Sequence, residues 1–314
     1  MIARGEVVDR PQFSQSVEAE PISVPALDGY RLGAYFYAAP APRAPARVAV
    51  VHCGVGIRAV RYRRFASFLA ASGIPTLLYD YRGIGASRPR SLRGFRAGVE
   101  DWAEYDCAGA IVWLRSRYPD AEMVAIAHSF GALLVGGAPN STEQDRLVLV
   151  AGHTGYYRDY HPRYRVPMTA VWHALMPVVT LALGYFPAQH LGLGEDIPAK
   201  VALQWAARRS PDLRPKDSEA RFARVQAMLD RSAALQRPAL VVSISDDAFA
   251  TEGGVKRLLS YYPRLFPLER IMYTPADAGT RRIGHFGLFG RRAGAALWPR
   301  LLAQLEPSPN ESRL

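Results

Sequence analysis

Short apolar runs rich in β-branched residues alternate with longer helical patterns along most of this 314-residue chain. Parallel strands need long crossover connections, usually helices, so this alternation is typical of a mostly parallel sheet with both faces covered. We therefore predict an α/β fold. The expected strands are Tyr30–Ala38, Arg47–Cys53, Pro75–Asp80, Met123–His128, Arg146–Gly152, Ala239–Ser245 and Glu269–Thr274.

One interval interrupts the alternation, because no strand is expected from His153 to about Arg237. We interpret residues 153–237 as a helical cap inserted into a core of residues 1–152 and 238–305, with a plain helical decoration as the alternative. A cap here would cover the sheet edge where open α/β sheets bind their ligands. Residues 306–314 are expected to be a disordered tail. Core helices are expected near Tyr62–Ser72, Ala97–Tyr118, Phe130–Gly137, Gly254–Tyr262 and Ala293–Leu305.

The formal net charge is +11, and arginine supplies almost all of the basic residues. Apart from the cluster Arg58–Phe65 these residues are spread along the chain, without a zinc-finger or RNA-recognition pattern, so no nucleic-acid partner is expected. Two cysteines, Cys53 and Cys107, are too few for a disulfide framework or a cysteine zinc site. Without the apolar core of a signal peptide at the N-terminus, a cytoplasmic location is expected.

Val166–Phe186 is the one stretch long enough to suggest a membrane span. It also contains His173 and Pro177, so we expect a buried or interfacial helix pair and no stable membrane insertion. The oligomeric state stays open.

The sequence VAIAHSFGALL, residues 124–134, places Ser129 at the end of a strand and the start of a helix. A serine on such a sharp turn projects its hydroxyl above the sheet, and its neighbours two positions away must be small. Ala127 and Gly131 meet that requirement, although alanine at 127 departs from the usual G-x-S-x-G. Ser129 is therefore a candidate nucleophile, and the alternative is an ordinary helix N-cap serine.

A nucleophilic serine needs a base and an acid, which follow it in the order Ser, Asp, His on this fold. His285 comes after the last expected strand and is the candidate base. Asp247 is the preferred acid after the penultimate strand, with Asp246 as the alternative. His153 and the other cap histidines are interpreted as structural.

Acyl transfer also needs backbone N–H donors for the developing oxyanion. Phe130 is one candidate, and either Gly54 or Val55 supplies the other, while Cys53 is interpreted as a packed side chain. An apolar substrate pocket is predicted from four residues of the cap, and a core-facing stripe would give the same pattern: Trp172, Met176, Tyr185 and Phe186.

These residues resemble the α/β-hydrolase superfamily, and more closely the bacterial serine aminopeptidase-like (S33-type) hydrolases. The resemblance covers nearly the whole chain and rests on YRRFASFLAASG, LLYDYRGIGASRP, AHSFG, LGLGEDIPAKVALQWA, SDDAFAT and PADAGTRRIGHFGLF, in that order. It implies an eight-stranded sheet, a triad of Ser129, Asp247 and His285, and a helical cap. It does not imply a particular substrate.

The resulting hypothesis is a serine hydrolase that cleaves a carboxylic ester, or a related acyl bond, with an apolar group. A small-molecule acyl substrate is the expected partner, and no cofactor or metal is expected. The alternatives are an amidase or aminopeptidase-like enzyme, and a noncatalytic binding protein with this fold. A nucleotide-dependent oxidoreductase is a further alternative, because G-x-G-x-x-A begins at Gly54 and Asp80 ends the next strand.

Overall fold

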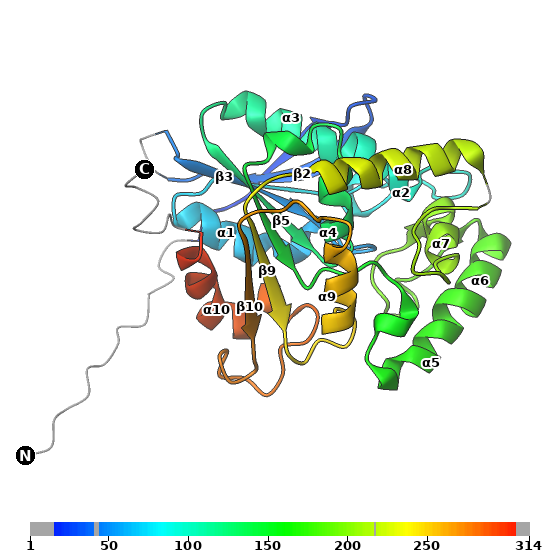
Figure 1. Ribbon diagram of the computed structural model, residues 1–314. Helices are drawn as coiled ribbons and strands as arrows, with labels where there is room; N and C mark the ends of the chain where they lie inside the picture. The colour runs from blue at the N-terminus through cyan, green and yellow to red at the C-terminus, as the bar shows by residue number, and fades with distance from the viewer. Residues whose placement is uncertain (1–15, 41–43, 217, 306–314) are drawn as a thin grey trace, which may run out of the picture.

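The computed structural model of the protein describes residues 16–40, 44–216 and 218–305, and the predicted tail at 306–314 lies outside them. In this part of the chain eight strands form one sheet in the order β1-β2-β4-β3-β5-β6-β9-β10 (Figure 1). The strands are β1 (Glu20–Pro25), β2 (Arg31–Tyr37), β3 (Arg47–His52), β4 (Thr76–Tyr79), β5 (Glu122–His128), β6 (Arg146–Val150), β9 (Ala239–Ile244) and β10 (Leu268–Tyr273).

In this order the six strands from β4 to β10 run parallel to one another, whereas β2 pairs antiparallel with both β1 and β4. The predicted α/β class, with a mostly parallel sheet, is confirmed. All the expected strands are present, and the largest difference at an end is Gly152 predicted against Val150 observed.

Three strands were not predicted. In β1 only Val24 is buried, and Pro21 and Pro25 mask the strand signal in a segment that forms the sheet edge, where proline is tolerated. The expectation of no strand between His153 and Arg237 was wrong in detail. There β7 (Tyr185–Phe186) pairs with β8 (Ile197–Pro198), a ladder too short to give a period-2 pattern.

Helices cover both faces of the sheet. On one face α1 (Arg63–Ala71) packs against α10 (Arg291–Ala303) (Figure 1). The opposite face carries the helical run of α2 (Val99–Asp101), η3 (Trp102–Cys107) and α3 (Ala108–Arg117), together with α4 (Gly131–Leu134), η4 (Val135–Gly137) and α9 (Glu252–Leu259). Strand β5 is buried on both faces from Met123 to His128, so it runs through the centre of the core.

The insertion between β6 and β9 is helical and contains two groups. The first is a continuous helix, α5 (Pro162–Ala170), η7 (Val171–Leu175) and α6 (Met176–Leu183), which packs on α7 (Ala199–Ala206). The second is α8 (Glu219–Ala234), which packs on η4. Arg224 of α8 also pairs with Asp101 at 2.8 Å and Glu104 at 2.6 Å, so α8 is tied to the core. That residues 153–237 work together as a cap stays a prediction.

The turn from β5 into α4 brings two backbone segments unusually close. A Cβ atom at Gly131 would lie 2.4 Å from the carbonyl oxygen of His52 and 2.6 Å from that of Cys53. No real Cβ tolerates such distances to backbone atoms. Glycine at 131 therefore allows α4 to begin against the end of β3.

Gly131→Ala is expected to lower the free energy of unfolding by roughly 1–3 kcal/mol, because the added methyl overpacks against backbone that has no room to move. Gly253→Ala in α9 is the matched control, since no atom lies closer than 3.8 Å to a Cβ there. Alanine at an open helical position is expected to be neutral or stabilising. Urea denaturation measures both, and equal effects would contradict the close approach at Gly131.

Candidate active site

Ser129 stands on the strained turn that the sequence predicts. Its φ angle is 56°, and Ala151 is the other non-glycine residue with positive φ among the described residues. The left-handed conformation costs of order 1–3 kcal/mol for such a residue, so the surrounding contacts must hold it. The Ser129 N–H donates to the carbonyl oxygen of Val150 at 2.9 Å, which anchors the turn on β6.

The structure brings His285 and Asp247 to this serine. His285 Nε2 lies 2.8 Å from Ser129 Oγ, and His285 Nδ1 lies 2.7 Å from Asp247 Oδ2. Asp247 follows β9 and His285 follows β10. Both loops leave the carboxyl edge of the sheet, so these residues lie close to Ser129 although they are far from it in the sequence. The imidazole is largely buried, with 8% of its side chain exposed.

Asp247 is held as a carboxylate. Burial raises its pKa, but the charge and hydrogen bond of His285 and the N–H groups of Phe249 and Ala250 outweigh burial, so the pKa lies below its usual value. Those N–H groups donate to Oδ1 at 2.8 and 3.1 Å and leave Oδ2 for the imidazole.

Asp246, the alternative acid, points elsewhere. Its two oxygens accept the backbone N–H groups of Ile283 and Gly284, at 3.0 and 2.9 Å. The carboxylate therefore braces the loop that carries His285 and makes no contact with the ring itself in the described structure. The sequence favoured Asp247 without excluding Asp246. In the structure Asp247 contacts the imidazole of His285, and Asp246 contacts the backbone before it.

A second histidine, His153, also contacts the serine, and sequence reasoning assigned it only a structural place in the cap. Its Nε2 lies 3.1 Å from Ser129 Oγ, while its Nδ1 accepts the N–H of Gly155 at 3.0 Å. Because Nδ1 is an acceptor, Nε2 carries the proton and donates to the serine. The available signal was that His153 follows β6, the strand beside β5 at the same sheet edge.

His153 stays neutral over the ordinary pH range. Burial, with a smaller contribution from the charge of His285, lowers its pKa from 6.5 to about 3. The serine hydroxyl thus sits between an N–H donor on one side and the Nε2 acceptor of His285 on the other.

The predicted oxyanion donors differ in availability. The N–H of Gly54 already donates to the hydroxyl of Tyr62 at 3.2 Å. Those of Val55 and Phe130 have no acceptor within the described part of the chain. A Cβ atom at Gly54 would lie 3.1 Å from that of Ser129, which shows that this loop passes directly beside the serine. Val55 is therefore the more available of the two alternatives.

The residue before the serine, His128, links two loops. Tyr62 Oη, which accepts from Gly54, lies 2.8 Å from His128 Nδ1, and His128 Nε2 lies 2.9 Å from the carbonyl oxygen of His285. Since a carbonyl only accepts, His128 Nε2–H donates to His285 and its Nδ1 accepts from the tyrosine. The Gly54 loop and the His285 loop are joined through one buried imidazole.

A half-buried arginine packs on the ring of Phe130, the residue after the serine. The guanidinium carbon of Arg208 lies 4.5 Å from the ring centre of Phe130, and Nη1 donates to the carbonyl oxygen of Thr154 at 2.7 Å. Burial lowers the pKa of Arg208 to about 10, so the side chain is still charged at neutral pH.

The four predicted pocket residues lie in different surroundings and do not form one group. Trp172 stacks edge-on with Trp205 of α7, whose ring contacts Phe130 beside the serine at 5.1 Å between centroids. Met176 and Phe186 are fully buried in the hydrophobic core, and Tyr185 pairs with β8. Their role as a pocket stays a prediction, with Trp172 the one that these ring contacts connect toward Ser129.

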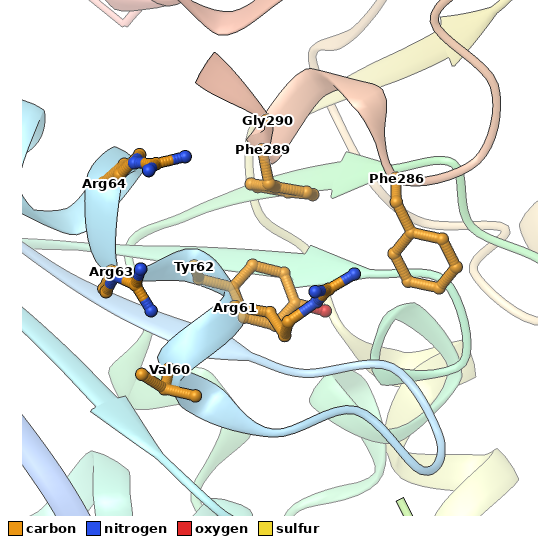
Figure 2. Close-up of a pocket in the computed structure, with 8 residues that line it drawn as sticks. All are labelled: Val60, Arg61, Tyr62, Arg63, Arg64, Phe286, Phe289 and Gly290. Carbon is orange, nitrogen blue, oxygen red and sulfur yellow. The ribbon is translucent and has the colours of Figure 1, made fainter. Parts of the chain in front are cut away.

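A cavity of about 200 Å³ lies between residues 60–64 and residues 286–290, which follow His285 in the chain (Figure 2). Tyr62 and Phe289 form part of its wall, and Arg61 extends toward Phe286, the residue after His285. None of the predicted pocket residues lines it, so it is a different space from the predicted apolar pocket.

Asp80 and Cys53 have structural surroundings. The Asp80 carboxylate accepts the N–H groups of Ala59 and Ala86, at 2.6 and 2.8 Å, and is buried, so it is not open to a ribose. Burial raises the pKa of Cys53 well above its usual value and keeps it a thiol. Among the described residues no three His, Cys, Asp or Glu side chains converge as a metal site would require.

This sheet order, with a serine on a strained turn after β5 and an acid and a histidine after β9 and β10, defines an α/β-hydrolase. The model of one family, serine aminopeptidase S33, matches residues 42–262. The chain belongs to this family. His285 lies beyond the matched residues, so its place rests on the structure.

Solved structures described as an esterase, a lipase and a dipeptidyl peptidase share the fold. An esterase from Pyrococcus furiosus matches at 14% identity and TM-score 0.56, over 92% of this chain and 90% of that one. A lipase in its open form matches at 17% identity and TM-score 0.57, over 91% of this chain and 97% of that one. A dipeptidyl peptidase from Porphyromonas gingivalis matches at 15% identity and TM-score 0.53, over 89% of this chain and 35% of that one. Such identities establish the fold alone.

Three buried histidines make stability depend on pH. Burial lowers the pKa of His52 to about 4 and that of His153 to about 3, and lowers that of His128 as well. Below about pH 6.5 the unfolded chain binds protons on these residues while the folded chain does not. The free energy of unfolding is therefore expected to fall from pH 6.5 toward 4, by up to about 1.4 kcal/mol per pH unit for each histidine.

Urea titrations of the native protein and of His52→Gln between pH 7.5 and 4.5 measure this dependence. The variant lacks one titrating group away from the serine and is expected to show a shallower slope. An unchanged slope would contradict a neutral, buried His52.

Proposed function

We propose that the protein is a serine hydrolase with Ser129 as nucleophile, His285 as general base and Asp247 as the acid that orients the imidazole. The observation that carries the proposal is the hydrogen-bonded chain from Ser129 Oγ through His285 to Asp247, at 2.8 and 2.7 Å. Both distances lie within the range needed for proton transfer and for fixing the imidazole tautomer.

In this mechanism Ser129 Oγ attacks an acyl carbonyl as its proton moves to His285 Nε2. The imidazolium that forms is stabilised by the Asp247 carboxylate and returns the proton to the leaving group. Water then attacks the acyl-enzyme, with His285 again as base. The N–H groups of Phe130 and Val55 would hold the oxyanion in both steps, and the charge of Arg208 favours negative charge nearby.

His153 adds one donor to this scheme. Its Nε2–H holds Ser129 Oγ in place and stabilises the negative charge that grows on Oγ as the proton leaves for His285. Since His153 is neutral and its Nδ1 is occupied by Gly155, it does not compete as a base.

The favoured substrate is a carboxylic ester with an apolar group. Support comes from Trp172, Trp205 and Phe130, whose rings contact one another in series and make the surroundings of the residue beside the serine apolar. An amide or peptide substrate is the second candidate, and the family description is the observation that favours it.

A panel of p-nitrophenyl esters of increasing chain length, beside aminoacyl arylamides, tests the substrate class. We expect esters to be cleaved faster, and Ser129→Ala to reduce kcat by at least about 10³-fold, because the covalent step is lost. Faster cleavage of the arylamides would move the assignment to the amidase alternative. Unchanged hydrolysis by Ser129→Ala would refute the nucleophile.

His153→Leu is expected to lower kcat about tenfold or more with little change in KM, since a hydrogen bond that strengthens in the transition state is removed. His153→Gln keeps an N–H donor of similar reach and should recover part of the loss. Equal kcat for native and leucine forms, with both folded by circular dichroism, would show that the contact is only structural.

A further inference from the structure

The helix Pro162–Leu183, made of α5, η7 and α6, is unusually apolar for its exposure. It is the one segment of the described chain that is long and apolar enough to cross a membrane, with a mean hydropathy of 1.6. Only 11% of the 18-residue stretch to which this hydropathy applies is buried inside the protein. In Figure 1, α5 and α6 lie along the outer edge of the molecule. One flank of the helix packs on α7, and much of the rest faces solvent.

Several exposed apolar side chains follow one another along this helix, while Leu175, which is 41% exposed, lies outside the series. Five exposed residues follow each other at intervals of four, four, four and three, which is one face of a helix, and we name them the outer stripe: Val166, Ala170, Ala174, Val178 and Leu181. Val166 is 79% exposed, Val178 68% and Leu181 73%. Two more exposed leucines, Leu191 and Leu193, follow in the next loop. Such a contiguous apolar surface marks an interaction site.

The charged residues of the segment that carries the outer stripe have one sign. From Tyr160 to Gly194 the sequence contains no aspartate or glutamate. Arg209 Nη2 donates to the carbonyl oxygen of His173, and Arg93 packs against Gly184 at the end of α6. Four exposed arginines, none with a carboxylate partner in the described structure, therefore lie in the helix or beside it: Arg163 and Arg165 within α5, and Arg209 and Arg93 next to the helix.

We propose that the outer stripe docks the protein on the surface of an anionic lipid bilayer. Apolar side chains would enter the boundary between headgroups and acyl chains, while the flanking arginines contact lipid phosphates. A second copy of this chain fits less well, because each copy would present the same cations and a net charge of +11 to the other. A spanning helix fits less well, because α6 is packed on α7.

Docking would place the candidate active site close to the lipid. The helix α6 packs on α7, and Trp205 of α7 contacts Phe130, the neighbour of Ser129. Esters dissolved in the bilayer would then reach the serine without crossing water. This consequence rests on the proposed hydrolase function, whereas the docking itself does not.

Flotation of the full-length protein with vesicles tests the docking. Vesicles of phosphatidylcholine alone are compared with vesicles of an equal mixture of phosphatidylcholine and phosphatidylglycerol. The native protein is expected to float with the mixed vesicles, and high salt is expected to weaken this binding. The double variant Val178→Ser/Leu181→Ser should lose about tenfold or more in affinity. Arg163→Gln/Arg165→Gln should lose most of the preference for the anionic mixture.

Met272→Ser is the matched control, an exposed apolar residue on the edge strand β10, and should bind like the native protein. Absence of flotation, or equal flotation of the Val178/Leu181 variant, would overturn the proposal. So would a dimer that this variant abolishes without any vesicle binding, or resistance to carbonate extraction, which indicates a spanning helix. Vesicle binding without hydrolysis of any ester or arylamide of the panel would leave the docking intact and refute the hydrolase proposal.

Discussion

The backbone strain at Ser129 is the constraint on which the site depends. A serine at φ 56° is disfavoured unless its surroundings hold it, and here the turn is fixed from two sides. β6 accepts the Ser129 N–H through Val150, and the carbonyl end of β3 leaves room only for glycine at 131. The strain is thus balanced by the two strands that flank β5, and it keeps the hydroxyl at the sheet edge where the other loops meet.

Those loops are tied to each other as well as to the serine. His128 joins the Gly54 loop to the His285 loop, and Asp246 binds the backbone just before His285. The two adjacent acids therefore have different partners: Asp247 contacts the His285 ring, and Asp246 holds the loop that carries it. A site built this way holds its geometry before any substrate arrives, which is what stabilisation of a transition state requires.

Much of the fold follows from local pattern. Most of the parallel strands are continuous apolar runs such as Val48–Val51, so their positions could be predicted closely. β1 could not, since one buried residue in an edge strand leaves almost no period-2 signal. The contacts of Ser129 with His285 and of His285 with Asp247 could be predicted because chain order on this fold is informative. The contact of His153 with Ser129 could not, because it depends on β6 lying beside β5. The choice between Gly54 and Val55 required the hydrogen bond from Gly54 to Tyr62, which no spacing reveals.

The central claim is that this network activates one serine among all those in the chain. Reaction with a fluorophosphonate probe, followed by peptide mass spectrometry, measures that activation directly because an unactivated serine does not react. The account predicts a single adduct on Ser129, which disappears in His285→Ala. A folded protein that takes no label, or an adduct on a different serine, would contradict it.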